Sequence, residues 1–204
     1  MNYNELAAKE IIEQTMAALK GRNINPVFVE TEEEALQKIK EIIPAGATVM
    51  TGGSTTLNEI GFSDLLISKN HPWKNLKDEI MDEKDPEKQS KLRRESVLAD
   101  YFLGSVHAVT RDGEVWVASA SGSQIPSYAF TSPNVIWVVG AQKIVPDSNA
   151  AADRIKNYVY PLEDKRMKST GATGSAIGRW LIFEREIMPS RKINLIFVNQ
   201  KLGF

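Results

Sequence analysis

The chain of 204 residues contains no cysteine and only two histidines, His71 and His107. It therefore forms no disulfide and offers no thiolate to a metal ion or an iron–sulfur cluster. Two histidines are also too few for a dense imidazole metal site. We expect no metal ion and no cofactor to be bound by this chain itself.

Long apolar runs and an excess of one charge are also missing. The 25 basic residues nearly balance the 26 acidic ones, which argues against a nucleic-acid binder that neutralises many phosphates. No apolar run approaches the roughly 20 residues needed for a membrane span. Charged residues such as Glu5, Lys9 and Glu13 interrupt the first 20 residues, so we expect no signal peptide and a cytoplasmic location.

The composition is that of a globular protein. Hydrophobic residues make up 42% and charged residues 25%, which predicts an ordered chain with a sizeable core. The length favours a single domain over residues 1–204. Within it, residues 1–44 form an N-terminal portion of helices and a strand, and the polar segment 70–86 is interpreted as a surface excursion.

Helical and extended patterns alternate along the chain. Apolar residues at helical spacing predict helices over 8–19 and 35–43, and Thr31 with Glu34 has the pattern of a capping box. A long helix is predicted over 87–103. Short apolar runs predict strands at 26–29, 47–51, 135–139 and 195–198.

The sequence Asp112-Gly113 predicts a hairpin turn between two further strands, 106–110 and 114–118. Strands that alternate with helices imply right-handed crossovers between parallel strands. The predicted fold class is therefore α/β, with a mostly parallel sheet that the hairpin makes mixed and that helices flank.

The strongest functional signal is the loop Thr51-Gly52-Gly53-Ser54-Thr55-Thr56, which follows a predicted strand and opens a predicted helix. Glycines let the backbone approach a ligand closely, and the N–H groups and hydroxyls that follow suit an anion. No lysine follows the glycines, so a P-loop is disfavoured, and the G-x-G-x-x-G pattern of a dinucleotide site is missing. The alternative is a turn in which Ser54 only caps the helix.

A second loop, Ser121-Gly122-Ser123-Gln124, follows the hairpin and repeats this pattern, again with helix capping as the alternative. Loops at the carboxyl ends of parallel strands face one crevice, so we expect the two loops to share a ligand. Lys143 follows the strand 135–139 and is a candidate cationic ligand group, with a surface lysine as the alternative.

Glu59 and Glu114 are the candidate general bases. Glu59 lies one helical turn past the first loop, which would let its carboxylate reach the same crevice, and the alternative is a solvated helix residue. Asp100 lies among apolar residues and needs a partner. His107 lies in an apolar strand and is interpreted as a packed core histidine rather than a catalytic one.

Several segments together resemble the LUD domain family, of the LutC/YkgG type, which is known from lactate utilisation. The segments are Gly53-Ser54 with Glu59 and Gly61, Leu98–Ala108, Asp112–Val115, Val138–Val145, Pro189–Ile193 and Leu202-Gly203-Phe204. The resemblance implies a fold similar to the NagB/RpiA/CoA-transferase superfamily, in which such a loop binds a phosphate or an acyl carrier. It also implies lactate oxidation alongside an iron–sulfur partner protein.

Three functional hypotheses follow. The chain is a component of lactate or organic-acid utilisation that binds a small anionic ligand, or a stand-alone isomerase or transferase acting on a sugar phosphate or acyl-CoA, with Glu59 or Glu114 as base. The third is a ligand-binding regulatory module without chemistry. The sequence leaves the oligomeric state open, a homo-oligomer included.

Overall fold

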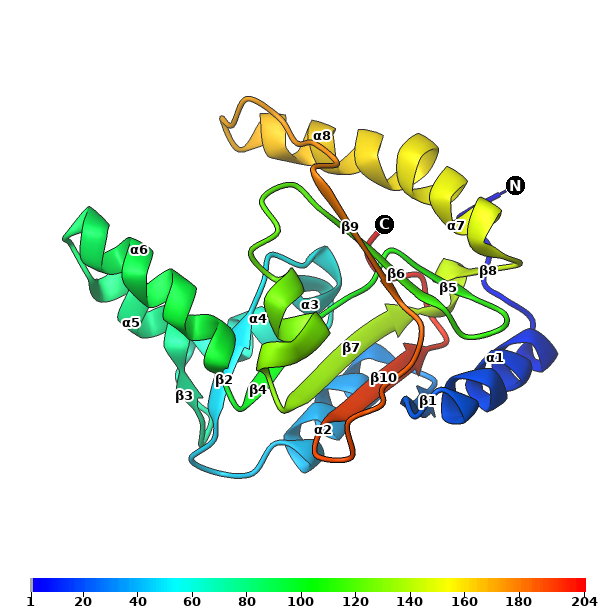
Figure 1. The fold of residues 1–204 in the computed structure, drawn as a ribbon, viewed down its shortest axis with the longest axis horizontal. Coiled ribbons are helices and arrows are strands. Elements are labelled where there is room, and N and C mark those ends of the chain that lie inside the picture. Colours follow the sequence, from blue (N-terminus) through cyan, green and yellow to red (C-terminus); the bar gives the residue numbers. More distant parts are fainter. Residues whose placement is uncertain (1) are drawn as a thin grey trace.

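The structure, a computed structural model, describes residues 2–204. Its main sheet has six strands that are all parallel to their neighbours (Figure 1). In spatial order they are β1 (Asn25–Val29), β10 (Lys192–Val198), β7 (Asn134–Gly140), β4 (Tyr101–Gly104), β2 (Thr48–Thr51) and β3 (Lys74–Asn75). Parallel strands need long crossovers, which agrees with the helices between them.

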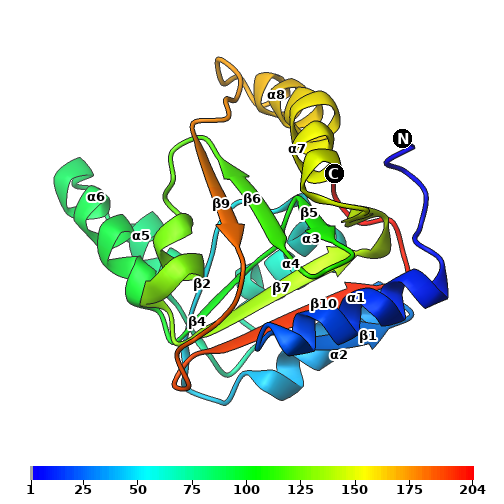
Figure 2. The ribbon, with the colours of Figure 1, turned by 45° about the vertical axis from the view of Figure 1, so that its right-hand side comes forward.

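A second sheet of four strands stands over the first (Figure 2). Its order is β8 (Ile144–Val145), β5 (Ala108–Thr110), β6 (Val115–Ser119) and β9 (Arg179–Phe183). The strands β5 and β6 form the antiparallel hairpin, and Gly113 takes the positive φ of 93° that its turn requires.

Both faces of the main sheet are buried, because alternate side chains of its central strands enter two different cores. Trp137 and Leu195 belong to a core formed with helix α1 (Lys9–Gly21) and the inner face of the second sheet. Ile136 and Ile196 belong to the opposite core. That core is covered by the helices α2 (Glu32–Ile42), α3 (Thr55–Glu59) and α4 (Phe62–Ile67).

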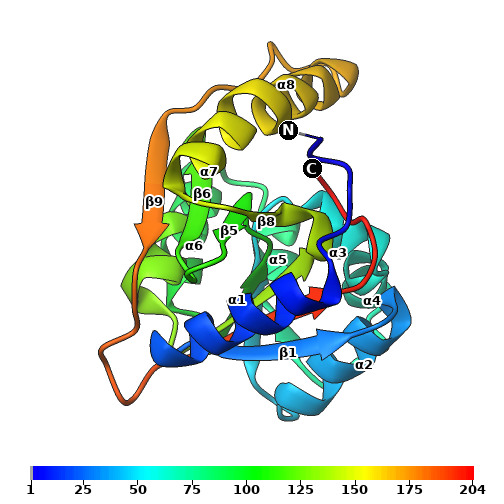
Figure 3. The ribbon, with the colours of Figure 1, turned by 90° about the vertical axis from the view of Figure 1, so that its right-hand side faces the viewer.

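A third core lies on the outer face of the second sheet. There Trp116 and Val145 pack against Ala151 and Ile155. These two come from α7 (Ser148–Arg154) and the π-helical turn η4 (Ile155–Val159), which continue into α8 (Tyr160–Ser169). Figure 3 shows this continuous helical segment lying across the second sheet.

The predicted fold class is confirmed, with one correction. The hairpin does not make the main sheet mixed, because β5 and β6 belong to the separate second sheet. The physical reason is that both faces of the hairpin are apolar. Val109, Val115 and Val117 face the core over the main sheet, while Ala108 and Trp116 face α7, so the hairpin forms a layer of its own.

The predicted long helix over 87–103 is wrong in its second half. Helix α6 covers only Pro86–Glu95, a 3₁₀ turn η1 follows over Ser96–Leu98, and the chain then enters strand β4. Short apolar runs fit a helix or a strand equally well. Here the Asp100 carboxylate accepts hydrogen bonds from the Thr48 N–H (2.9 Å) and hydroxyl (2.7 Å), which fixes β4 beside β2.

Two further elements differ from the sequence interpretation. The segment 70–86, interpreted as a surface excursion, supplies β3 and helix α5 (Leu76–Asp82), and Trp73 and Ile80 are buried. Strand β9 was not predicted. The helical segment that Asp147 caps runs through α7, η4 and α8 to Ser169. Within the described residues, no helix is both long and apolar enough to cross a membrane.

Candidate functional site

A cavity of about 310 Å³ lies at the carboxyl ends of four strands of the main sheet. Thr56, Ser105, Lys143 and Gly203 line it, and they follow β2, β4, β7 and β10 respectively. The loop 119–124, which leaves β6, lines it from the second sheet. Parallel strands bring residues far apart in the chain to this one edge of the sheet.

The first loop forms one wall of the cavity through Gly53, Ser54, Thr55 and Thr56. Ser54 caps helix α3, as the alternative interpretation of this loop predicts, since its side chain accepts a hydrogen bond of 3.2 Å from the Leu57 N–H. Helix α3 has only five residues, so its dipole contributes little to an anion site. The more specific feature is the Thr56 hydroxyl, which accepts a hydrogen bond from Lys143.

The second loop meets the first in space. A Cβ at Gly52 would lie 2.5 Å from Oε1, the flexible end of the Gln124 side chain, so the two loops are in close contact at this glycine. A Cβ at Gly53, by contrast, would meet nothing. In the second loop, Gly122 has a φ of 80°, and the hydroxyls of Ser121 and Ser123 hydrogen-bond to each other at 3.1 Å.

Lys143 is the most unusual charged residue of the cavity, since the residue is buried, with a relative exposure of 2%. Its ammonium donates to the Thr56 hydroxyl at 3.1 Å and to the Ser105 hydroxyl at 3.0 Å. Burial, together with the positive charge of Arg154, lowers the pKa of Lys143 to about 7, while Glu59 acts in the opposite direction. The alternative of a surface lysine is therefore contradicted.

Glu59 lies beside the cavity and contacts the C-terminal segment. Its Oε2 accepts a hydrogen bond of 2.5 Å from the Gly203 N–H. A Cβ at Gly203 would overlap the Thr56 hydroxyl and lie 3.1 Å from the Lys143 ammonium. Glu59 thus holds Gly203 in place. A larger residue there would leave no room for the Thr56 hydroxyl and the Lys143 ammonium.

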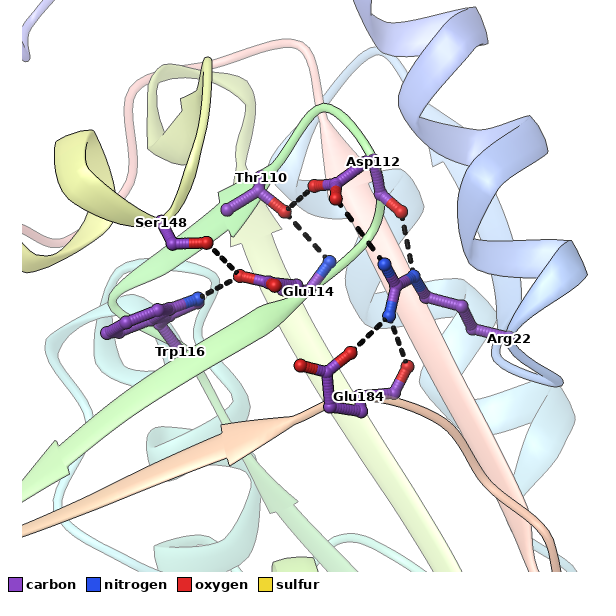
Figure 4. Close-up of polar contacts among 7 residues, drawn as sticks. All are labelled: Arg22, Thr110, Asp112, Glu114, Trp116, Ser148 and Glu184. Atoms are coloured by element: carbon purple, nitrogen blue, oxygen red, sulfur yellow. Dashed lines mark hydrogen bonds and ion pairs between the residues drawn. The ribbon is translucent and has the colours of Figure 1, made fainter.

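Glu114 is not brought to the cavity. Figure 4 shows its carboxylate beside the β5–β6 turn, where it accepts hydrogen bonds from the Trp116 indole (2.9 Å) and the Ser148 hydroxyl (2.6 Å). The neighbouring Asp112 and Glu184 contact Arg22, which ties the end of α1 to the second sheet. These contacts give Glu114 a structural role in joining the hairpin to α7.

His107 and Arg154 contact each other, and both lie close enough to Lys143 to interact with it electrostatically. His107 is among the residues that line the cavity, and its imidazole Nδ1 accepts a hydrogen bond of 3.1 Å from the Ala118 N–H. Burial, with the positive charges of Lys143 and Arg154, lowers the pKa of His107 to about 3. The fully buried Arg154 donates to the His107 carbonyl at 2.5 Å and lies over the ring of Tyr158 at 5.3 Å.

The outer wall was not predicted from the sequence. Tyr160, Glu163 and Arg166 of α8 line it, and the guanidinium of Arg166 binds the Glu163 carboxylate through two hydrogen bonds of 2.7 Å. Nothing in the local sequence marks α8 as part of a site. Ser105 was missed because the segment before it was assigned to a helix. In the described chain, no cluster of three or more His, Cys, Asp or Glu side chains is arranged to hold a metal ion.

These features define an α/β protein with a polar, cation-bearing cavity at the carboxyl edge of a parallel sheet. The family model of the LUD domain matches residues 12–196, and the chain belongs to this family. This match confirms the resemblance to the LUD domain family that the sequence segments indicate.

Two solved structures resemble the chain to different extents. A DUF162 family protein from Deinococcus radiodurans has a TM-score of 0.57 at 12% identity, covering 96% of this chain and 100% of that one. The eIF2B beta structure from Chaetomium thermophilum has a TM-score of 0.39 at 15% identity, covering 57% of this chain and 44% of that one. The first supports the fold alone, and the second likeness is too low to support an argument. No curated protein sequence matches the chain.

Proposed function

We propose that this protein binds a small organic anion in the cavity, with the acidic group at Lys143, as a component of lactate or other organic-acid utilisation. The observation that supports this is the buried ammonium of Lys143, whose partners are two hydroxyls rather than a carboxylate. An ammonium has three donors, and two are used within the protein. Within residues 2–204 the third has no partner, which leaves it for a ligand.

The electrostatics of the site support an anion rather than a neutral ligand. A buried charge is costly unless an opposite charge or several hydrogen bonds compensate it. Arg154 adds a second positive charge next to Lys143, and the Glu59 carboxylate that opposes them already accepts the Gly203 N–H. An acidic group bound at Lys143 would offset this excess of positive charge.

The direct test is calorimetric titration of the protein with lactate, acetate and inorganic phosphate. We expect at least one to bind, and Lys143→Met to weaken that binding by about tenfold or more, because a charge-assisted hydrogen bond contributes roughly 1.5–3 kcal/mol. Affinity should fall as the pH rises past about 7, since Lys143 then loses its proton.

The matched control is Lys201→Met, which removes the same charge from an exposed position. It should leave affinity unchanged. Binding that survives Lys143→Met, or the absence of binding by every member of a wider panel of organic acids, would contradict the proposal.

The place in an organic-acid pathway rests on family membership and on the implied iron–sulfur partner. The chain has no cysteine, so any cluster would belong to another protein. Affinity purification under anaerobic conditions, from cells grown on lactate, should recover a cysteine-rich protein with iron–sulfur absorption. Recovery of no such protein, with the bait folded, would count against this role.

A second candidate is an isomerase or transferase that acts on a sugar phosphate or an acyl-CoA. It is favoured by the pKa of Lys143 near 7, which suits proton transfer at neutral pH, and by the extension of the cavity to α8. Neither Glu59 nor Glu114 is among the residues that line the cavity. Glu59 remains its candidate base, because its carboxylate binds the N–H of the lining residue Gly203. Stabilisation by phosphosugars or CoA esters, at roughly 2.7 kcal/mol for ligand at about 100 times its Kd, would support it over a carboxylate binder.

A further inference from the structure

The hydrogen bonds of His107 fix the chemical form of its imidazole. A backbone N–H can only donate, so the bond from Ala118 to Nδ1 requires a lone pair on Nδ1 and places the ring proton on Nε2. A second proton on the ring would have to sit on Nδ1 and would face the Ala118 N–H. The geometry therefore holds His107 as a neutral imidazole that donates through Nε2.

The other polar groups of His107 are used within the protein. Its backbone N–H donates to the Trp116 carbonyl at 2.9 Å, and its carbonyl accepts from Arg154 at 2.5 Å. Within residues 2–204, Nε2 is the one polar atom of His107 that has no hydrogen-bond partner. It is not completely enclosed by protein atoms, so a ligand can reach it. Since the residue lines the cavity, Nε2 is the atom that it offers to a ligand.

We propose that His107 is a specificity residue whose Nε2–H donates to an uncharged oxygen of the bound anion, so that the site selects acids bearing an oxo or hydroxyl group near the acidic group. This rests on the proposed anion site at Lys143. The two groups differ in kind, because Lys143 attracts negative charge whereas a neutral N–H donor needs only an acceptor lone pair. A simple alkyl carboxylate would leave the His107 donor unpaired in a buried site, which is costly.

The experiment compares pyruvate with propionate, which have the same length and charge and differ in one oxo group. In the unaltered protein we expect pyruvate to bind about three- to tenfold more tightly, as one hydrogen bond to an uncharged oxygen allows. His107→Asn keeps an acceptor for the Ala118 N–H but has no group at the Nε2 position. It should abolish the preference while leaving propionate affinity unchanged, and His107→Gln, whose amide reaches further, should retain part of it.

The outcomes separate the two proposals. If both acids bind in a Lys143-dependent manner with no preference, or if His107→Asn leaves the preference intact, the role of His107 is overturned and the anion site stands. If neither these acids nor any other binds, both proposals fail.

A second measurement tests the imidazole directly, without a ligand. Long-range ¹H–¹⁵N correlation spectra should show His107 as the neutral Nε2–H form from pH 5 to pH 8, and since the chain has two histidines, His107→Asn assigns the signals. The Nδ1–H form, or protonation near the ordinary pKa of about 6.5, would overturn the inference.

Discussion

Lys143 and His107 divide the recognition chemistry of the cavity between a cation and a neutral donor. Both residues are buried polar groups, yet their environments act differently on them. Burial lowers the pKa of Lys143 to near neutrality although two hydroxyls accept from its ammonium. Burial, two nearby cations and the Ala118 N–H together keep His107 uncharged. The site therefore presents one group whose charge depends on pH and one whose charge does not.

The burial of Lys143 makes stability depend on pH. Its pKa is about 7 in the folded protein and about 10.4 in an unfolded chain, so between these values the unfolded state binds more protons and folding stability rises with pH. At pH 6 the folded state bears the full cost of the buried charge. We expect Lys143→Met to be more stable than the unaltered protein at pH 6, by about 1–4 kcal/mol, and the difference to shrink towards pH 9.

Urea unfolding of both proteins at pH 6 and pH 9 measures this difference. The exposed Lys201→Met is the control and should differ little from the unaltered protein at either pH. A difference that grows with pH would contradict the low pKa assigned to Lys143.

Strand β4 is the element that connects the core to the cavity. Its last residue, Gly104, precedes Ser105. The Ser105 hydroxyl accepts a hydrogen bond from Lys143, and the Ser105 carbonyl accepts one from the Tyr128 hydroxyl. Tyr128 packs edge-on against Phe102 and Trp137, with ring centroids 5.3 and 5.5 Å away. A Cβ at Gly104 would overlap the Tyr128 hydroxyl, so the strand and the aromatic cluster fit only with a glycine here.

Gly104→Ala should therefore destabilise the protein by about 1–3 kcal/mol through overpacking. Tyr128→Phe removes the hydroxyl that the new methyl group would meet. In the double variant we expect part of the stability lost in Gly104→Ala to return, which a double-mutant cycle of urea unfolding free energies detects. Additive effects of the two changes would show that the clash is absorbed elsewhere.

At the scale of the whole molecule, the two sheets share one core. Val109, Val117 and Phe183 of the second sheet belong to the same cluster as Trp137 and Leu195 of the main sheet. Neither sheet can expose this face without leaving the apolar surface of the other in water. The cavity is lined both by residues that follow the main-sheet strands and by residues at the end of β6 in the second sheet. Its geometry therefore depends on this shared core.

We expect the chain to unfold in a single cooperative transition in urea, because the shared core couples the two sheets. Of the four tryptophans, Trp137 is the one that is fully buried within that core, so the fluorescence of a variant that keeps Trp137 alone reports on it. Far-ultraviolet circular dichroism reports on both sheets and the helices. The two transitions should coincide. An earlier loss of part of the dichroism would show that the second sheet unfolds separately.

The sequence alone determined the class of fold, the family and several of the loops. Apolar runs such as 135–139 are buried on both faces, and the Asp112-Gly113 turn joins two strands as its pattern predicts. Both signals are local, since the spacing of apolar residues in a strand and the backbone angles of a turn depend on residues that are close in the sequence. The same holds for Thr31, whose side chain caps the helix that follows it.

Only the tertiary structure decided which of the candidate residues meet. Lys143, Ser105 and Gly203 come together because four parallel strands end at one edge, while Glu114 is turned away towards Ser148. The segment around Phe102 is a strand because Asp100 binds Thr48, 52 residues earlier in the chain. Long-range contacts of this kind leave no periodicity in the sequence, because the partners lie on separate elements and are brought together only when the sheets pack.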